Sequence, residues 1–226
     1  MGAERIDPLV IVMLGVAMLT FSYLMTWFDE NQPLATKCNF LLVLLVTGVV
    51  ARLLWWLVFR ESLRGDLHFS SGRMVITAIS AGLLVATASR LWVVVKAGMS
   101  AEFLAGASIN VQRAFYVLAA VSEESFFCWA VLLGGLVLLG NRQLVLLEKL
   151  PLPGWPIALF GTSILFAVWH AAVYGTGAML QMMFFYRLLF GFSYIASEWF
   201  WGEKYLGIAM LAHATINYLA TGGGMG

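Results

Sequence analysis

Two adjacent carboxylates, Glu123 and Glu124, are the residues whose type and position most call for a chemical explanation. They lie near the middle of an apolar run at 115–139, and a run of that length predicts a helix within a lipid bilayer. A charged side chain at the bilayer centre costs about 2.5–3.5 kcal/mol on insertion scales, so an intramembrane ionisable residue is a functional candidate by default. Three later polar residues also fall in apolar runs: His170, His213 and Asn217.

The spacing of these residues predicts how they face one another. His213 and Asn217 are four residues apart, which places them on one face of a helix. Neighbouring helical residues diverge by about 100°, so Glu123 and Glu124 cannot both point at one spot. We expect one glutamate to face a reaction centre and the other to support it from behind. The whole set is expected to converge on a water-holding cavity below the membrane surface.

Two carboxylates, two imidazoles and an amide are suited to hydrolysing an amide bond without a nucleophilic serine. A carboxylate with an imidazole polarises a water by general-base catalysis. A second imidazole and an amide N–H₂ donate hydrogen bonds to the oxyanion of a tetrahedral intermediate. The same groups also ligate divalent metals, although the chain contains no HExxH element, which disfavours a zinc protease of that kind. Cys128 is interpreted as a small buried packing residue rather than a nucleophile.

The composition determines which elements position these groups. The chain has 226 residues, of which 62% are hydrophobic and only 11% are charged. Soluble domains carry roughly 25% charged residues, so we expect an all-α, polytopic membrane helix bundle. The net charge of +1 argues against a nucleic-acid partner. The two cysteines form no CxxC pair, so neither a disulfide framework nor a zinc knuckle is indicated.

The apolar runs predict about seven transmembrane helices, and an eighth span would fit in the glycine- and alanine-rich region at 97–110. The predicted helices cover residues 8–28, 38–59, 74–95, 111–139, 155–174, 178–197 and 205–220. The segment at 140–154 is predicted to be a loop. We expect a single structural unit, with N-terminal helices and loops in 1–110 and the core that carries the polar set in 111–220.

At these residues the sequence resembles the CAAX protease and bacteriocin-processing (CPBP, or Abi) family of intramembrane endopeptidases. The pattern of that family is EExxxR on one helix, FxxxH on the next, and HxxxN or HxxxD near the end. The corresponding stretches here are EESFFC at 123–128, FAVWH at 166–170 and HATIN at 213–217. The resemblance covers residues 111–220, and the three motifs occur in the order of the family.

The resemblance implies a role for each residue of the set. Glu123 would be the base that activates a water, assisted by His170, and Glu124 would be the bracing carboxylate. His213 and Asn217 would form the oxyanion hole. No cofactor is implied, and a divalent metal stays open.

The family also implies the kind of substrate and the place of the protein in the cell. It includes the type II endopeptidases that remove the last three residues of prenylated CAAX proteins, and bacterial members tied to bacteriocin maturation or self-immunity. The expected partners are therefore a peptide or lipidated protein substrate and membrane lipid. We expect an integral, multi-pass protein of a prokaryotic cell membrane or, in a eukaryote, of the endoplasmic reticulum.

One position departs from the family pattern. The arginine that follows the second glutamate by four residues is Cys128 here. Our hypothesis is that Arg187, in the predicted helix at 178–197, substitutes for it, because a guanidinium in the membrane otherwise lacks an obvious partner. A distance of more than one water layer between Arg187 and both glutamates would end this hypothesis.

Two other classes of protein compete with the peptidase. The first is a non-catalytic membrane protein of the same fold, an immunity factor or scaffold whose polar set only locks helices together. The missing motif arginine favours this alternative. The second is a transporter, because intramembrane carboxylates also serve proton coupling. The chain shows no pair of broken-helix repeats, which disfavours transport.

Overall fold

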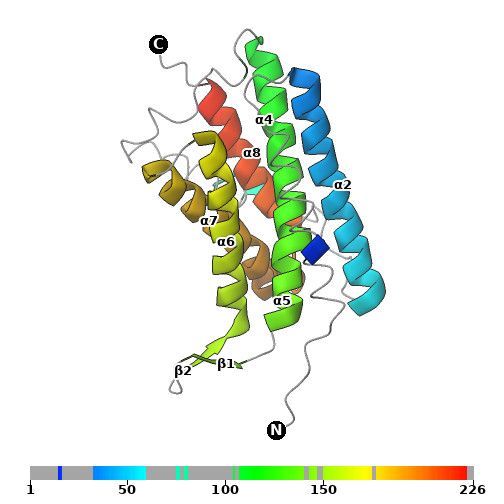
Figure 1. Cartoon of the computed structure of the whole chain (residues 1–226), viewed down its shortest axis with the longest axis vertical. Coiled ribbons are helices and arrows are strands. Elements are labelled where there is room, and N and C mark those ends of the chain that lie inside the picture. Colours follow the sequence, from blue (N-terminus) through cyan, green and yellow to red (C-terminus); the bar gives the residue numbers. More distant parts are fainter. Residues whose placement is uncertain are drawn as a thin grey trace.

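The fold is known from a computed structural model, and it is a bundle of long helices with one small hairpin (Figure 1). The structure describes residues 15–16, 33–59, 75–76, 79–80, 104, 107–139, 143–146, 150–174 and 177–222. The helices predicted at 8–28 and 74–95 therefore lie almost entirely outside the described residues. Of the span considered at 97–110, only residues 104 and 107–110 are described, and the last two belong to the helix that begins at Ile109.

Five long helices make up the described bundle. Their bounds are α2 Leu34–Phe59, α4 Ile109–Glu124, α6 Gly154–Tyr174, α7 Ala178–Trp201 and α8 Leu206–Gly222, and α4 continues without a break through the π-helix η3 Ser125–Leu132 into α5 Leu133–Leu139. Each matches a predicted helix to within a few residues. The sequence marks two of the ends. Ser108 accepts a hydrogen bond from the Val111 N–H at 3.4 Å and caps α4, and Gly202, with φ +80°, ends α7 in the left-handed conformation.

The segment predicted to be a loop at 140–154 contains a β-hairpin. Strand β1 (Gln143–Leu146) pairs antiparallel with β2 (Leu150–Pro153), with Gln143 opposite Pro153. A proline has no N–H to donate to a neighbouring strand. Both strands of this two-stranded sheet are edge strands, so β2 has no second neighbour that would need such a donor. The loop prediction was wrong because prolines are compatible with an edge strand.

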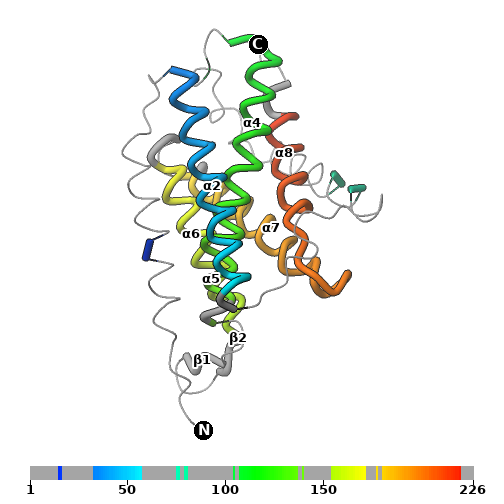
Figure 2. The backbone as a smooth tube through the Cα atoms, turned by 90° about the vertical axis from the view of Figure 1, so that its right-hand side faces the viewer, coloured from blue at the N-terminus to red at the C-terminus, as the bar shows by residue number. Residues whose placement is uncertain are grey.

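The π-helix η3 lies at the centre of the bundle. All of its residues are buried. Phe126, Phe127 and Ala130 belong to an apolar cluster shared with α2, α4 and α6. Cys128, Trp129 and Leu132 belong to a second cluster shared with α6, α7 and α8. Figures 1 and 2 show α2 running beside the continuous α4–α5 rod in both views, with α8 close to α4.

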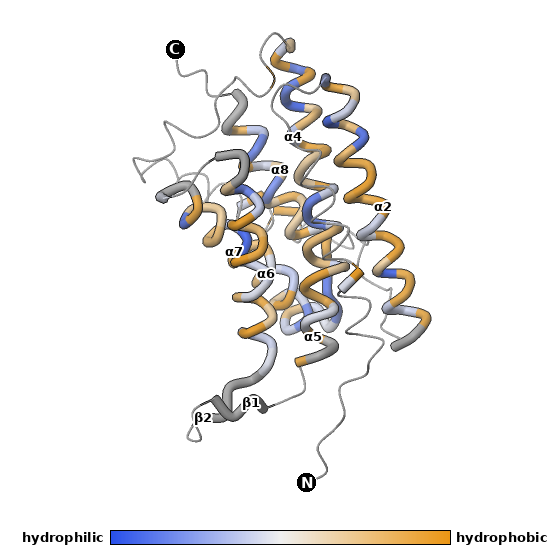
Figure 3. Tube along the Cα trace, viewed as in Figure 1, coloured by the Kyte–Doolittle hydropathy of each residue, from blue (hydrophilic) through white to orange (hydrophobic). Residues whose placement is uncertain are grey.

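Three of the described helices are long and apolar enough to cross a membrane. These stretches are Leu34–Leu57, Ile109–Leu136 and Gly154–Ala171, and a shorter apolar helix covers Leu206–Leu219. Figure 3 shows that α2 is hydrophobic over most of its length. On α6, the exposed ridge of Phe160, Ile164 and Val168 presents apolar side chains outward. An apolar helix exterior of this kind is compatible with a membrane protein.

Candidate active site

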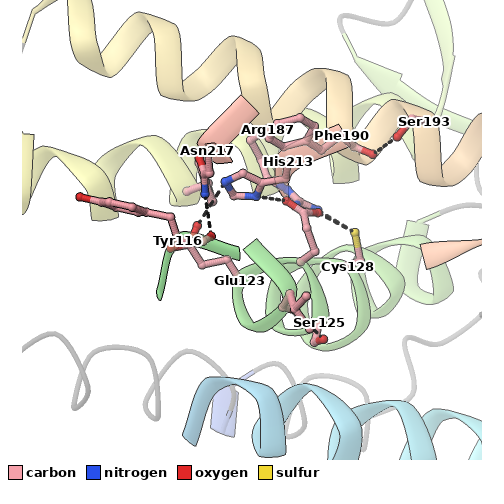
Figure 4. Close-up of polar contacts among 12 residues, drawn as sticks. Tyr116, Glu123, Ser125, Cys128, Arg187, Phe190, Ser193, His213 and Asn217 are labelled. Carbon is pink, nitrogen blue, oxygen red and sulfur yellow. Dashed lines mark hydrogen bonds and ion pairs between the residues drawn. The ribbon is translucent and has the colours of Figure 1, made fainter. Parts of the chain in front are cut away.

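The glutamate pair occupies the last turn of α4, where the chain enters η3. Glu124 is fully buried and faces α7 and α8, whereas Glu123 lines a cavity. Figure 4 shows Arg187, His213 and Asn217 approaching this helix from one side. The predicted divergence of the two carboxylates is confirmed: Glu124 contacts Arg187 and Glu123 lines the cavity, although both lie near His213.

Glu124 is held by hydrogen bonds from three other residues. Its Oε2 accepts a hydrogen bond from Arg187 Nη1 at 2.6 Å, and both side chains have no exposed surface. Its Oε1 accepts the Nδ1–H of His213 at 2.9 Å. The Cys128 thiol donates to Oε2 at 3.4 Å. A buried charge needs several hydrogen-bond partners, because an ion that is taken out of water loses several kcal/mol of hydration free energy.

The contact that the Arg187 hypothesis requires is present. The guanidinium touches Glu124 directly and also donates from Nη2 to the Cys128 sulfur at 3.0 Å. Arg187 therefore contacts both the Glu124 carboxylate and Cys128, the residue at the position where the family pattern has arginine. The interpretation of Cys128 as a packing residue was incomplete: the side chain is buried, but its thiol also belongs to the polar cluster.

Glu123 faces both imidazoles across the cavity wall. Its Oε2 lies 3.8 Å from His170 Nε2 and 3.8 Å from His213 Nε2. His170 Nδ1 is 2.8 Å from the carbonyl oxygen of Phe166, and a carbonyl can only accept, so Nδ1 carries the proton. In each neutral ring the Nδ1–H is thus directed away from Glu123, and Nε2 presents its lone pair toward the carboxylate.

Aromatic rings fix the planes of the two imidazoles. Phe190 stacks on His213 with 4.7 Å between ring centroids and 17° between planes. Phe166 lies 4.1 Å from the His170 ring, one helical turn before it on α6. Rings held by an aromatic contact and at Nδ1 by a hydrogen bond keep their Nε2 atoms aimed at Glu123.

Asn217 lies beside the same cavity, one turn after His213 on α8. Its Nδ2 donates to the carbonyl oxygen of Tyr116 on α4 at 3.1 Å. One amide hydrogen therefore ties α8 to α4. This bond also fixes the direction of the amide group next to His213.

The cavity that Glu123, His170, His213 and Asn217 share has a volume of about 70 Å³. One water needs roughly 10–15 Å³ of such volume, so several waters fit. The rest of the wall is mainly aromatic, with Lys37 of α2 as a further charged residue on it. Lys37 is buried and was not among the predicted site residues, because the sequence places it only at the polar start of an apolar run.

The described residues contain no set of three or more His, Cys, Asp or Glu side chains placed to hold a metal ion. Comparison with known proteins finds no protein-family model, no curated protein and no solved structure that the chain matches.

Proposed function

We propose that the chain is an intramembrane endopeptidase of the CPBP kind that hydrolyses a peptide bond with a water activated by Glu123. The observation that carries the proposal is the equal distance of 3.8 Å from one Glu123 oxygen to the Nε2 atoms of His170 and His213, on the wall of a cavity. Support also comes from the convergence of α4, α6 and α8, which carry the three sequence motifs.

The reaction begins with a water that donates one hydrogen bond to Glu123 and one to the lone pair on His170 Nε2. The water oxygen attacks the carbonyl carbon of the peptide while its proton passes to the Glu123 carboxylate. Protonated Glu123 then gives this proton to the amide nitrogen as the C–N bond breaks. The products are a carboxylic acid and an amine, and no covalent intermediate with the protein forms.

His213 and Asn217 stabilise the oxyanion of the tetrahedral intermediate. His213 donates to it in the form that carries a proton on Nε2. In that form the ring is cationic, and the Glu124 carboxylate behind Nδ1 balances its charge. Arg187 keeps Glu124 ionised and immobile by their contact of 2.6 Å. Glu124 and Arg187 are thus positioning residues, and Glu123 is the one that exchanges protons.

The cavity wall and the surrounding helices support a class of substrate. Aromatic side chains and apolar helices favour a membrane-associated peptide or lipidated protein, and a prenylated CAAX-type protein is one such substrate. We also propose that the protein crosses the membrane seven or eight times. It would lie in a prokaryotic cell membrane or in the endoplasmic reticulum.

The test uses the purified full chain in nanodiscs and a library of quenched fluorescent peptides, with and without a lipid tail. We expect Glu123→Gln to lower hydrolysis at least about 100-fold, the lower end of the general-base contribution. Glu198→Gln is the control, because Glu198 is exposed and pairs only with Lys204 among the described contacts. Full activity in Glu123→Gln would refute the mechanism.

One observation favours the non-catalytic alternative. The contacts of Glu124 with Arg187 and His213 join α4, α7 and α8 and would lock the bundle without any reaction. If the parent chain cleaves no peptide, and variants of Glu124 or Arg187 lose thermal stability alone, the scaffold function is the better account.

A further inference from the structure

The π-helix η3 begins at the residue that follows Glu124. A π-helix closes its hydrogen bonds over five residues instead of four, and the Leu133 N–H accordingly donates to the carbonyl of Cys128. If residues 125–132 formed a regular α-helix instead, the part of the helix before them would be rotated relative to the part after them. The rotation would be about 100°, the turn that one residue makes in an α-helix. The wide turn therefore helps to determine where Glu123 and Glu124 point.

Helix geometry implies that the wide turn leaves one carbonyl without a backbone donor. The Leu133 N–H donates to the Cys128 carbonyl, five residues back. In the α-helix that follows, the next N–H pairs with the carbonyl of Ala130, so this geometry passes over the carbonyl of Trp129. The indole N–H of Trp55, on α2, donates to that oxygen at 2.8 Å. Both tryptophans are buried, so water cannot supply a substitute donor, and a buried carbonyl without one is costly.

A second contact from α2 meets the other end of η3. A Cβ atom built on Gly48 would lie 2.6 Å from the carbonyl carbon and oxygen of Ser125 and 2.9 Å from the Phe126 nitrogen. No real side chain fits there, so the backbones of α2 and η3 touch at this point. Gly48 is seven residues before Trp55 and hence on the same face of α2.

We infer that α2 is a clamp that holds η3 in its wide-turn form and thereby aims Glu123 at the cavity and Glu124 at Arg187. Trp55 and Gly48 are positioning residues: Trp55 supplies the hydrogen bond that the wide turn requires, and Gly48 permits the close approach. The catalytic consequence rests on the proposed function, whereas the structural consequence does not. The two are tested separately.

The structural test is amide hydrogen exchange, followed by mass spectrometry, of the full chain in nanodiscs. Trp55→Phe removes the N–H and keeps an aromatic ring, and Trp56→Phe is the matched control at the next, exposed position. Exchange at 125–133 is expected to rise about tenfold in Trp55→Phe, the effect of losing one buried hydrogen bond. Exchange in α6 is expected to stay unchanged, as is exchange at 125–133 in Trp56→Phe.

A second variant approaches the clamp from its other end. Gly48→Ala should raise exchange at 125–133 in the same way, and Gly161→Ala on α6, where a Cβ meets nothing within 4 Å, is its control. Unchanged exchange at 125–133 in both Trp55→Phe and Gly48→Ala would overturn the clamp. A rise of equal size in every helix would also overturn it, because that result shows only general destabilisation.

The catalytic test measures peptide hydrolysis by the same variants. A positioning role predicts that Trp55→Phe lowers kcat about tenfold and leaves KM within about twofold, because the substrate wall is untouched. If the parent cleaves peptides and Trp55→Phe changes neither constant, the inference fails and the proposed function stands. If the parent cleaves nothing, the exchange measurements still decide whether α2 is a clamp.

Discussion

Glu123 and Glu124 are neighbours in the chain, yet their surroundings give them different chemistry. Glu124 has no exposed surface and accepts hydrogen bonds from Arg187, His213 and Cys128. Glu123 borders the cavity, and its Oε2 lies 3.8 Å from the Nε2 atoms of both histidines. A carboxylate saturated by donors holds its charge and position, whereas one that borders a cavity is suited to accept a proton from a water and return it.

A double-mutant cycle at positions 128 and 187 tests whether one cation must serve Glu124. Arg187→Met leaves a buried carboxylate without its cation and should destabilise the protein by about 3–5 kcal/mol. Cys128→Arg alone puts two guanidinium groups beside one carboxylate and should also destabilise it. In the double variant the new arginine, one turn after Glu124, takes over the contact. Thermal unfolding should therefore show a favourable coupling of about 1–3 kcal/mol.

The control for this cycle is Lys204→Met, which breaks a partly exposed pair with Glu198 at 3.1 Å. Such a pair is worth only about 0–1 kcal/mol. Strictly additive losses in the Cys128 and Arg187 variants would contradict the view that these two positions share one carboxylate.

The sequence predicted which polar residues form the site better than it predicted the contacts that these residues make. The different directions of Glu123 and Glu124 follow from helix geometry alone, and Arg187 was predicted as a partner because an intramembrane cation needs one. The bond from Asn217 to the Tyr116 carbonyl and the position of Lys37 on the cavity wall were not predictable. Both depend on which helices become neighbours, and one sequence does not determine that.

The helices themselves were predictable because long apolar runs with turn residues between them leave few alternatives. The π-helix was not. Its sequence, SFFCWAVL, is apolar apart from Ser125, so no periodicity distinguishes a helix whose hydrogen bonds span four residues from one whose bonds span five. The contacts of Gly48 and Trp55 distinguish them, and these come from a helix far away in sequence. The hairpin at 143–153 was missed for a different reason: its prolines indicated a loop.

A glycine at the start of α6 gives a prediction at the element scale. A Cβ on Gly154 would overlap the carbonyl oxygen of Leu139, the last residue of α5. Gly154→Ala must therefore separate the ends of α5 and α6 and should cost about 1–3 kcal/mol of stability, as overpacking does. Gly161→Ala, in open space on the same helix, should be neutral. Equal melting temperatures for the two variants would show that the helix ends separate freely.

In the whole molecule the site draws on both parts of the chain. The residues of the polar set and Arg187 come from α4, α6, α7 and α8, within the predicted core at 111–220. However, α2 belongs to the segment at 1–110, and it packs along η3 and places Lys37 on the cavity wall. The N-terminal segment therefore contributes to the site, because one of its helices forms part of the cavity wall.

The two histidines separate a peptidase from a scaffold of the same fold. His213 bonds to buried Glu124 at 2.9 Å, so His213→Asn should lower stability by about 1–3 kcal/mol whether or not the protein is an enzyme. The hydrogen bond from His170 Nδ1 to the Phe166 carbonyl stays within one helix, whereas the bond of His213 to Glu124 joins two. His170→Asn should therefore lower the melting temperature less than His213→Asn does, yet lower peptide hydrolysis at least about 100-fold. A scaffold has no reason to aim a second imidazole at Glu123, so an active His170→Asn variant would remove the main support for catalysis.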